Sequence, residues 1–148
     1  MIRTVFLLLV GTLLAIAPGL ALSAAELPTI PLSINGNKLV AETATTDEQI
    51  TTGLMHRFSL KPDHGMVFVF DRQEPRTFWM KNTFIPLSIA FIAADGRILN
   101  IEDMAPQDES LHYSRGAAMY TLEMRKGWFA ERGIRAGDRV SGLPPPKR

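Results

Sequence analysis

The 148-residue sequence contains no cysteine. This absence excludes a disulfide framework, a zinc site with thiolate ligands, an iron–sulfur cluster and a cysteine nucleophile. It also excludes a lipoprotein that is anchored through an N-terminal cysteine. Because hydrophobic residues make up 46% of the chain and charged residues 21%, the composition is that of a globular protein that can bury a core.

An excess of either sign of charge is also lacking. The chain has 16 Lys and Arg against 15 Asp and Glu, and it contains no long basic run. Proteins that bind nucleic acid or anionic lipid carry a basic patch or stripe. We therefore expect no nucleic-acid partner, and the expected partner is a small molecule or a protein of the cell envelope.

A hydrophobic run of membrane-spanning length is missing as well. The longest apolar stretch, Val5 to Ile16, is shorter than the roughly 20 residues that a transmembrane helix requires. It follows the positive charge of Arg3 and precedes the small residues around Ala24, which is the three-part pattern of a cleavable secretory signal. We predict a signal peptide over residues 1–25, a periplasmic or secreted mature protein, and no stable membrane insertion after cleavage.

Beyond this segment the sequence predicts one β-rich domain over residues 26–142, followed by a Pro-rich exposed tail over residues 143–148. Asn35-Gly36 and Asp95-Gly96 each separate two apolar segments, and these dipeptides favour two-residue hairpin turns. Further apolar segments predict strands at residues 65–70, 76–80, 87–93, 98–104, 119–125 and 139–142, and the first three of these are predicted to be buried.

Helix signals are few. Thr45-Thr46 and Glu48-Gln49 have the spacing of a capping box, which predicts a helix that begins here and ends at about Arg57. A second helical turn is expected over residues 127–133, where the last glycine supplies a stop. The predicted fold class is therefore mainly β (α+β): a compact antiparallel sandwich or partial barrel, with one short N-terminal helix and a second helical turn near the C-terminus.

Three segments of the sequence are distinctive. They are Gly53-Leu54-Met55-His56-Arg57, Gly65-Met66-Val67-Phe68-Val69-Phe70, and Phe78-Trp79-Met80-Lys81-Asn82-Thr83 followed by Ile85-Pro86-Leu87. On these residues, the chain over about residues 36–142 resembles the bacterial and archaeal family known as domain of unknown function 192. The resemblance implies a small β-rich single domain that is often exported, and it implies no established activity, cofactor or catalytic residue.

One position departs from that family, which often has an aspartate where this chain has Ser88. If such a carboxylate were catalytic, this chain would be inactive. A two-residue loop at Asp95-Gly96 places Ser88 opposite Asp103 and Ile92 opposite Leu99. The simpler interpretation is therefore that the position requires a short hydrogen-bonding side chain opposite Asp103.

Motifs of known catalytic chemistry are absent. His56, His64 and His112 are not spaced as paired metal ligands, and there is no Gly-x-Ser-x-Gly elbow, no Ser-x-x-Lys pair and no phosphate-binding glycine loop. We therefore expect no cofactor and no metal site. A non-catalytic binding or accessory module of the cell envelope is favoured over an enzyme.

Candidate ligand-binding residues follow one another at the end of a predicted strand. Trp79, Lys81 and Asn82 stand where side chains can line the mouth of a pocket. Lys81 would hold an anionic group of a ligand, and Asn82 would fix its orientation. In the alternative interpretation, Trp79 belongs to the core, and Asn82 and Thr83 bond to the backbone of their own loop.

Arg57, Asp103 and Glu123 complete the candidate set. Glu123 lies in an otherwise apolar strand segment, so an inward-pointing carboxylate requires a partner such as Arg57 or Lys81. A closed pair is structural, whereas a pair that opens into a cleft is a ligand site. The alternative of an enzyme requires Lys81, Asn82, Asp103 and Glu123 to converge on one polar cleft.

Methionines give a second alternative. Thioether sulfur selects Cu(I), so an exported protein could bind this ion through methionines. The residues are scattered singly, and most stand in predicted strands beside aromatic and branched residues, which is typical of core packing. The six methionines of the mature chain are Met55, Met66, Met80, Met104, Met119 and Met124.

Overall fold

The computed structural model of the chain describes residues 27–145, and the signal peptide predicted over residues 1–25 lies outside them. The strands are β1 (Thr29–Ile34), β2 (Asn37–Ala44), β3 (His64–Glu74), β4 (Thr77–Phe78), β5 (Leu87–Ile92), β6 (Ile98–Met104), β7 (His112–Tyr113), β8 (Ala118–Arg125) and β9 (Val140–Ser141). The helical elements are α1 (Asp47–Thr52) and a 3-10 turn, η1 (Ala130–Arg132). Within the described range, neither of these has the length and hydropathy of a membrane span.

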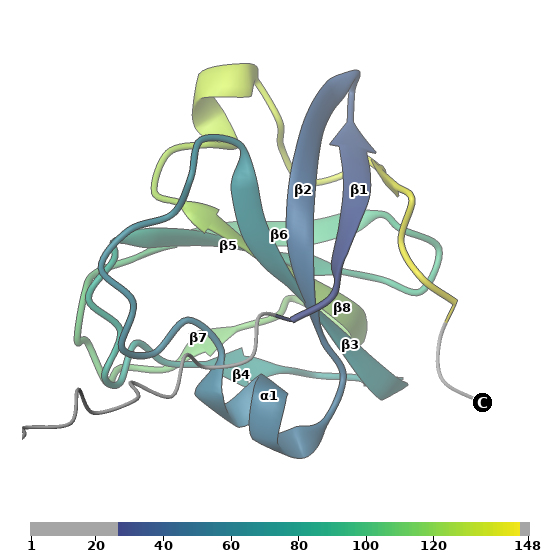
Figure 1. Cartoon of the computed structure of the whole chain (residues 1–148). Helices are drawn as coiled ribbons and strands as arrows, with labels where there is room; N and C mark the ends of the chain where they lie inside the picture. The colour runs from purple at the N-terminus through teal and green to yellow at the C-terminus, as the bar shows by residue number, and fades with distance from the viewer. Residues whose placement is uncertain (1–26, 146–148) are drawn as a thin grey trace, which may run out of the picture.

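Seven strands form one sheet in the order β6-β5-β8-β3-β2-β1-β9, which curls into a half-barrel (Figure 1). A second, small sheet of β4 and β7 lies on the same side as α1 (Figure 1). The mainly β class is therefore confirmed, and the shape is a half-barrel rather than a sandwich. The neighbours β2 and β3 are parallel, unlike the other pairs of the sheet, because the chain crosses over through α1 between them.

Apolar side chains cover both faces of the large sheet. Successive side chains of a strand point to opposite faces, so β3 contributes Val67 and Val69 to one core cluster and Met66 and Phe68 to the other. Every residue of β5 is likewise buried. This double burial explains why the sequence over residues 65–70 is a continuous apolar run rather than an alternating one.

The two predicted hairpins differ in how closely they follow the prediction. Asn35-Gly36 joins β1 to β2 with φ angles of 49° and 80°, as a type I′ turn requires. In the second hairpin, Ser88 pairs with Asp103 as predicted. The predicted pairing of Ile92 with Leu99 is wrong, because β6 contains a bulge near the turn and Ile92 instead pairs with the residue before Leu99.

Helix makes up very little of the fold, and α1 is shorter than predicted. Thr46 and Gln49 form the capping box, in which each side chain accepts a hydrogen bond from the other's backbone N–H at 3.2 Å. The predicted end at about Arg57 is wrong, because Gly53 has a φ of 46° and ends the helix. Its backbone also packs so closely that an added Cβ would lie 3.3 Å from the Phe68 ring.

The buried strand predicted over residues 76–80 is reduced to the two residues of β4. Strand β3 continues beyond the predicted end to Glu74, and Pro75 then breaks it, since proline lacks the N–H that a central strand needs. The chain leaves the large sheet here and β4 pairs with β7. The prediction of a fully buried strand is therefore wrong: Met80 is buried, but Trp79 is 43% exposed.

The C-terminal part follows the prediction in its helical turn and departs from it in its tail. The η1 turn ends at Gly133, which adopts the left-handed conformation with a φ of 66°. The tail is not exposed from its first residue, because Leu143 packs against the core. The carbonyl group of Pro144 accepts a hydrogen bond of 2.7 Å from the hydroxyl group of Tyr120.

Candidate functional site

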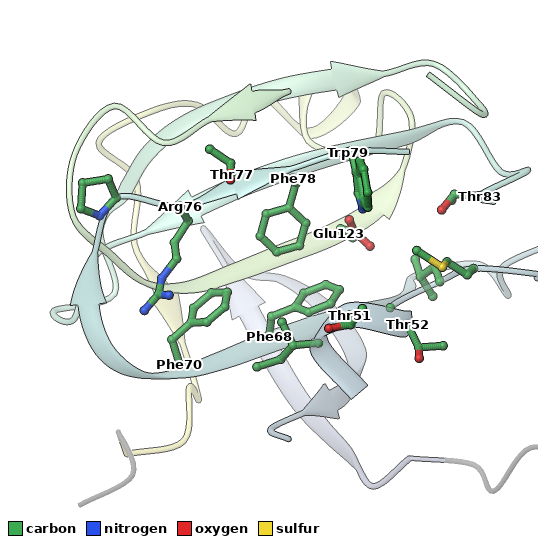
Figure 2. Close-up of a pocket in the computed structure, with 15 residues that line it drawn as sticks. Thr51, Thr52, Phe68, Phe70, Arg76, Thr77, Phe78, Trp79, Thr83 and Glu123 are labelled. Atoms are coloured by element: carbon green, nitrogen blue, oxygen red, sulfur yellow. The ribbon is translucent and has the colours of Figure 1, made fainter. Parts of the chain in front are cut away.

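A cavity of about 400 Å³ lies between α1 with its following turn and the strands β3, β4 and β8 (Figure 2). We call it the aromatic pocket. One wall is made of phenylalanine rings: β3 places Phe68 and Phe70 on the same face of the sheet, and β4 lays Phe78 across them. The Phe78 ring meets Phe68 edge to face at a centroid distance of 5.1 Å and Phe70 at 6.4 Å. The wall is therefore apolar.

Glu123 is the only carboxylic acid among the described residues that line the pocket. Its neighbours across the sheet are Met66 on β3 and Ile89 on β5, so both flanks are apolar and the residue is only 4% exposed. Within residues 27–145, no hydrogen bond or ion pair engages its carboxyl group. Burial raises the pKa of Glu123 from 4.5 to about 8, because the charged form loses its hydration. The group is therefore mainly neutral at pH 7.

Arg76 is the other charged side chain that lines the pocket. Its guanidinium group lies 3.9 Å from the centroid of Phe70 and 2.7 Å from a carboxylate oxygen of Glu74. In Figure 2, Arg76 lies toward one end of the pocket and Glu123 toward the other, with Phe78 between them. Burial lowers the pKa of Arg76, although the neighbouring Glu74 carboxylate opposes this.

Hydroxyl groups form the remaining polar part of the lining. Thr51 and Thr52 come from the last turn of α1, Thr77 from β4, and Thr83 from the loop that follows. The Thr83 hydroxyl donates a hydrogen bond of 3.1 Å to the carbonyl group of Lys81, which leaves its oxygen able to accept another. A ligand in the pocket would therefore meet apolar rings, acceptor oxygens and one carboxyl group.

The structure separates the three neighbouring residues that the sequence proposes as ligand contacts. Trp79 lines the pocket and is not a core residue. Lys81 points toward solvent, with its ammonium group 5.1 Å from the Trp79 ring and 4.0 Å from Glu109. Asn82 is exposed, adopts a φ of 53°, and its carbonyl group accepts a hydrogen bond from the backbone of His56. Neither Lys81 nor Asn82 lines the pocket.

Arg57 does not neutralise Glu123. It forms a bidentate ion pair with Glu42, in which the hydrogen bond from Nη2 to Oε2 is 2.7 Å long. Glu42 and Glu123 share a face of the sheet, but Met66 stands between them in the strand register. The ion pairs considered for Glu123, with Arg57 or with Lys81, are therefore both replaced by other contacts.

Asp103 lies on the opposite face of the sheet from Glu123. Its carboxylate accepts a hydrogen bond from Ser88, whose oxygen in turn accepts one of 2.9 Å from the backbone of Gly127. Ser88 pairs with Met124, the residue next to Glu123, and neighbouring residues of a strand point to opposite faces. The four polar residues of the enzyme hypothesis therefore do not converge. Ser88 acts as the short hydrogen-bonding side chain that the sequence predicts.

Metal ligands do not gather in the part of the chain that the structure describes. No group of three or more histidine and carboxylate side chains is placed to hold an ion within residues 27–145. The methionines lie mostly in the core: Met66, Met80 and Met104 belong to one core cluster and Met119 and Met124 to the other, while Met55 lines the pocket. Their main role is therefore apolar packing, as the sequence predicts.

Sequence reasoning missed most of the pocket. A signal was present, because the alternation of side chains along a strand places Phe68 and Phe70 on the face that Glu123 also occupies. That reasoning required the pairing of β3 with β8, which no local pattern supplies.

Comparisons with known proteins agree with this architecture. The family DUF192, described as "Uncharacterized ACR", matches residues 30–142. One solved crystal structure is that of a candidate transcription regulator from Sinorhizobium meliloti 1021, whose sequence is 35% identical to this chain and whose TM-score is 0.78. The match covers 81% of this chain and 98% of the regulator. A second crystal structure, of a protein of unknown function from Novosphingobium aromaticivorans DSM 12444, is 32% identical in sequence with a TM-score of 0.74. The match covers 86% of this chain and 91% of that protein. No curated protein matches the chain.

Proposed function

The chain belongs to the DUF192 family, and we propose that it is a non-catalytic binding module that holds a small ligand in the aromatic pocket. One observation carries the proposal: Glu123 is only 4% exposed at the pocket, and within residues 27–145 no group of the protein bonds to its carboxyl group. Its carboxyl oxygens are not sealed from solvent, so they reach the pocket and can bond to a ligand there. A carboxyl group in an apolar strand normally has a hydrogen-bond partner, and a ligand in the pocket can supply one.

The dimensions of the pocket support a small ligand. Sites for small molecules occupy roughly 300–1,000 Å³ and combine apolar walls with a few polar groups. The aromatic pocket, at about 400 Å³, lies in the lower part of that range. Its three rings supply the apolar wall, and Glu123 with the threonine hydroxyls supplies the orienting groups.

An enzyme is the alternative class, because a carboxyl group with a raised pKa is also typical of general acids. The lining favours binding, since among the residues that the structure describes Arg76 is the only other charged side chain on it, and it already pairs with Glu74. Lys81, Asn82 and Asp103 do not line the pocket. We also do not extend a role in transcription to this chain, because its charges are balanced.

A fragment screen with a blocked pocket tests the proposal. Thr51 lines the pocket from the exposed surface of α1, so T51W places a large ring in the opening without disturbing the core. E48W is the matched control, because Glu48 is an exposed residue of the same helix that does not line the pocket. Ligand-observed NMR should identify aromatic or aliphatic fragments that bind the unmodified protein and E48W but not T51W. A screen in which T51W affects no binding contradicts the proposal.

We further propose that the module is exported and acts in the cell envelope. The support is the pattern of the first 25 residues, which is that of a cleavable secretory signal. Fractionation of a Gram-negative host should recover the protein from the periplasm, with an intact mass that lacks about residues 1–25. The variant L8R/L9R interrupts the apolar run and should remain uncleaved in the cytoplasm. Full-length protein in the cytoplasm without these changes contradicts export.

A further inference from the structure

One end of the pocket carries the Glu123 carboxyl group, and within residues 27–145 no cation of the protein pairs with it. Glu123 faces the pocket from β8. The two cations that the sequence suggests as its partners, Arg57 and Lys81, form other contacts. Arg57 holds Glu42, and Lys81 stands outside the pocket over the Trp79 ring. The position that a positive charge would occupy beside Glu123 is therefore available to a ligand.

The opposite end of the pocket is already neutralised. Arg76 pairs with Glu74 and stacks on Phe70, so its charge is compensated by groups of the protein itself. An anionic ligand would have to compete with Glu74 for this guanidinium group. The pocket is therefore complementary to a cation at one end and not to an anion at the other.

The groups near Glu123 suit an ammonium ion. Indole attracts cations most strongly of the side chains, but the Trp79 ring already has the ammonium group of Lys81 at 5.1 Å, so the acceptor oxygens carry the argument. An ammonium group has three N–H donors. Glu123 and the hydroxyl oxygen of Thr83 provide acceptors in the same lining.

From this arrangement we propose that the ligand is a small primary ammonium compound with an apolar body. This inference rests on the proposed binding function and specifies its ligand class. The ammonium group bonds to the carboxylate of Glu123, and the apolar body packs on Phe68 and Phe78. Two sources supply this chemistry, a free alkyl or arylalkyl amine and the lysine side chain of another protein.

Binding of such a ligand releases a proton. Glu123 is mainly protonated at pH 7 in the free protein, and a bound ammonium favours its charged form, so the proton passes to the buffer. Met66, Ile89 and the α1 residues that line the pocket do not titrate. The paired charged groups on surrounding elements are Arg76 with Glu74, Arg57 with Glu42, Lys81 with Glu109, His112 with Glu102, and Arg125 with Glu131. The same elements also carry Asp47 and Glu48 on α1, His56 in the turn after it, and Asp71 and Arg72 on β3, and none of these five residues lines the pocket.

Three probes of one shape separate the effect of charge from that of the apolar body. Isothermal titration calorimetry should be carried out at pH 7 with 2-phenylethylamine, 2-phenylethanol and phenylacetate. We expect the amine to bind at least tenfold more tightly than the alcohol, and phenylacetate to bind more weakly than either. Titrations in two buffers of different ionisation enthalpy should report close to one proton released per amine bound.

The variant E123Q removes the charge and keeps the shape of the side chain. It should bind the alcohol as the unmodified protein does, lose the tenfold preference for the amine, and release no proton. E131Q is the matched control, because Glu131 is a carboxylate outside the pocket, and it should leave all three affinities unchanged. A further titration with Nα-acetyl-lysine N-methylamide identifies the source, because tighter binding than that of the amine indicates a lysine side chain.

The calorimetry results distinguish failure of the ammonium inference from failure of the proposed binding function. If the alcohol binds as tightly as the amine, or if E123Q retains the preference, the ammonium inference is overturned and the binding function stands. If the amine does not bind at millimolar concentration, the inference is also overturned. The proposed binding function falls only if, in addition, the fragment screen finds no ligand that T51W excludes.

Discussion

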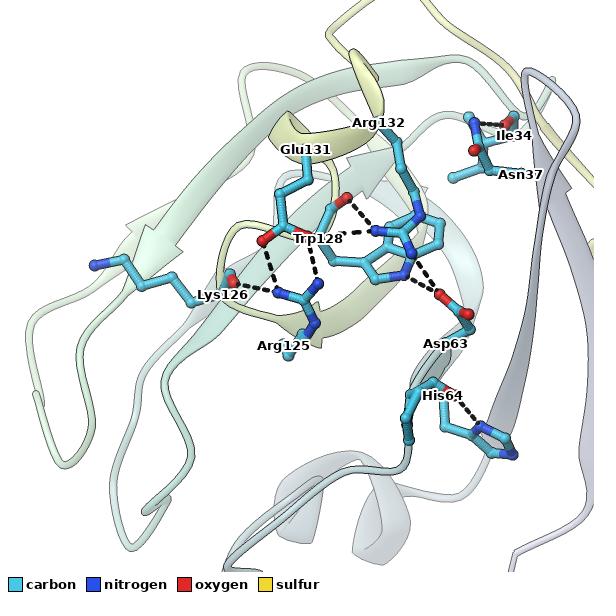
Figure 3. A network of polar contacts seen from close by, with 10 residues as sticks. Ile34, Asn37, Asp63, His64, Arg125, Lys126, Trp128, Glu131 and Arg132 are labelled. Atoms are coloured by element: carbon cyan, nitrogen blue, oxygen red, sulfur yellow. Dashed lines mark hydrogen bonds and ion pairs between the residues drawn. The ribbon is translucent and has the colours of Figure 1, made fainter.

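Asp63 and Trp128 are joined by a hydrogen bond of 2.8 Å, which the indole Nε1 donates to the carboxylate (Figure 3). Arg132 donates to the same oxygen at 2.7 Å, and its guanidinium group lies 4.3 Å from the centroid of the Trp128 ring. Trp128 is fully buried in the core. The contact therefore fastens the loop before β3 to the turn that leads into η1.

Replacement of Asp63 tests this contact. D63A leaves the buried indole N–H without its acceptor, which costs about 1–3 kcal/mol, and it places alanine at a φ of 55°, which costs about 1–2 kcal/mol more. D63N keeps an acceptor oxygen and tolerates this φ, so it should lose less than half as much. Urea unfolding measures both losses. Equal stability of D63A and the unmodified protein would show that the indole bond contributes nothing.

The pH dependence of stability should report Glu123. Because its pKa rises from 4.5 in the unfolded chain to about 8 in the folded protein, its contribution to stability is complete below pH 4.5 and is lost as the pH rises through 8. E123Q removes this dependence. Thermal and urea unfolding should show E123Q and the unmodified protein to be alike at pH 4, and E123Q to be more stable at pH 9 by on the order of 5 kcal/mol. A difference that does not vary with pH would contradict the raised pKa.

Ser88 offers a test of its bond to Asp103. S88D places a second carboxylate beside Asp103 on a position that is buried here. Repulsion and desolvation should lower the free energy of unfolding at pH 7 by about 1–3 kcal/mol. The double variant S88D/D103N removes the repulsion and should recover most of this loss in urea unfolding. No recovery would show that the two side chains do not interact.

Gly65 packs closely against β8. An added Cβ would lie 2.2 Å from the carbonyl oxygen of Glu123 and 2.3 Å from the sulfur of Met124. Because a backbone atom cannot yield as a side chain can, G65A should destabilise the fold by roughly 2–3 kcal/mol. G36A is a useful comparison, because Gly36 has open space and only its φ of 80° opposes a side chain. Equal losses in the two variants would contradict the close approach.

Local patterns of residues were sufficient for much of the fold. Asn35-Gly36 defines its hairpin through its own backbone preferences, and Thr46 with Gln49 defines the start of α1 through a bond between near neighbours. The register that pairs Ser88 with Asp103 follows from a short turn and the period of a strand. These features depend on residues that are close in sequence, so the sequence is sufficient to predict them.

Features that depend on distant segments could not be read in this way. Gly53 stops α1, and Pro75 sends the following segment out of the sheet, but the position of that segment depends on its packing over β3. The parallel pairing of β2 with β3 and the contact of β3 with β8 join strands without a direct turn. As a result, Trp79 became a pocket residue rather than a core residue, and Lys81 became a surface residue.

Composition and short motifs established that this is a cysteine-free, β-rich domain of the DUF192 family, because such features are local and cumulative. The long-range assembly of the chain decided which polar groups share a site. It buried Glu123 between Met66 and Ile89, directed Arg57 to Glu42, and turned Asp103 to the opposite face of the sheet. The physical reason is that a charge acquires its partner from the strand register and the crossings of the chain, and neither is encoded in the residues next to it.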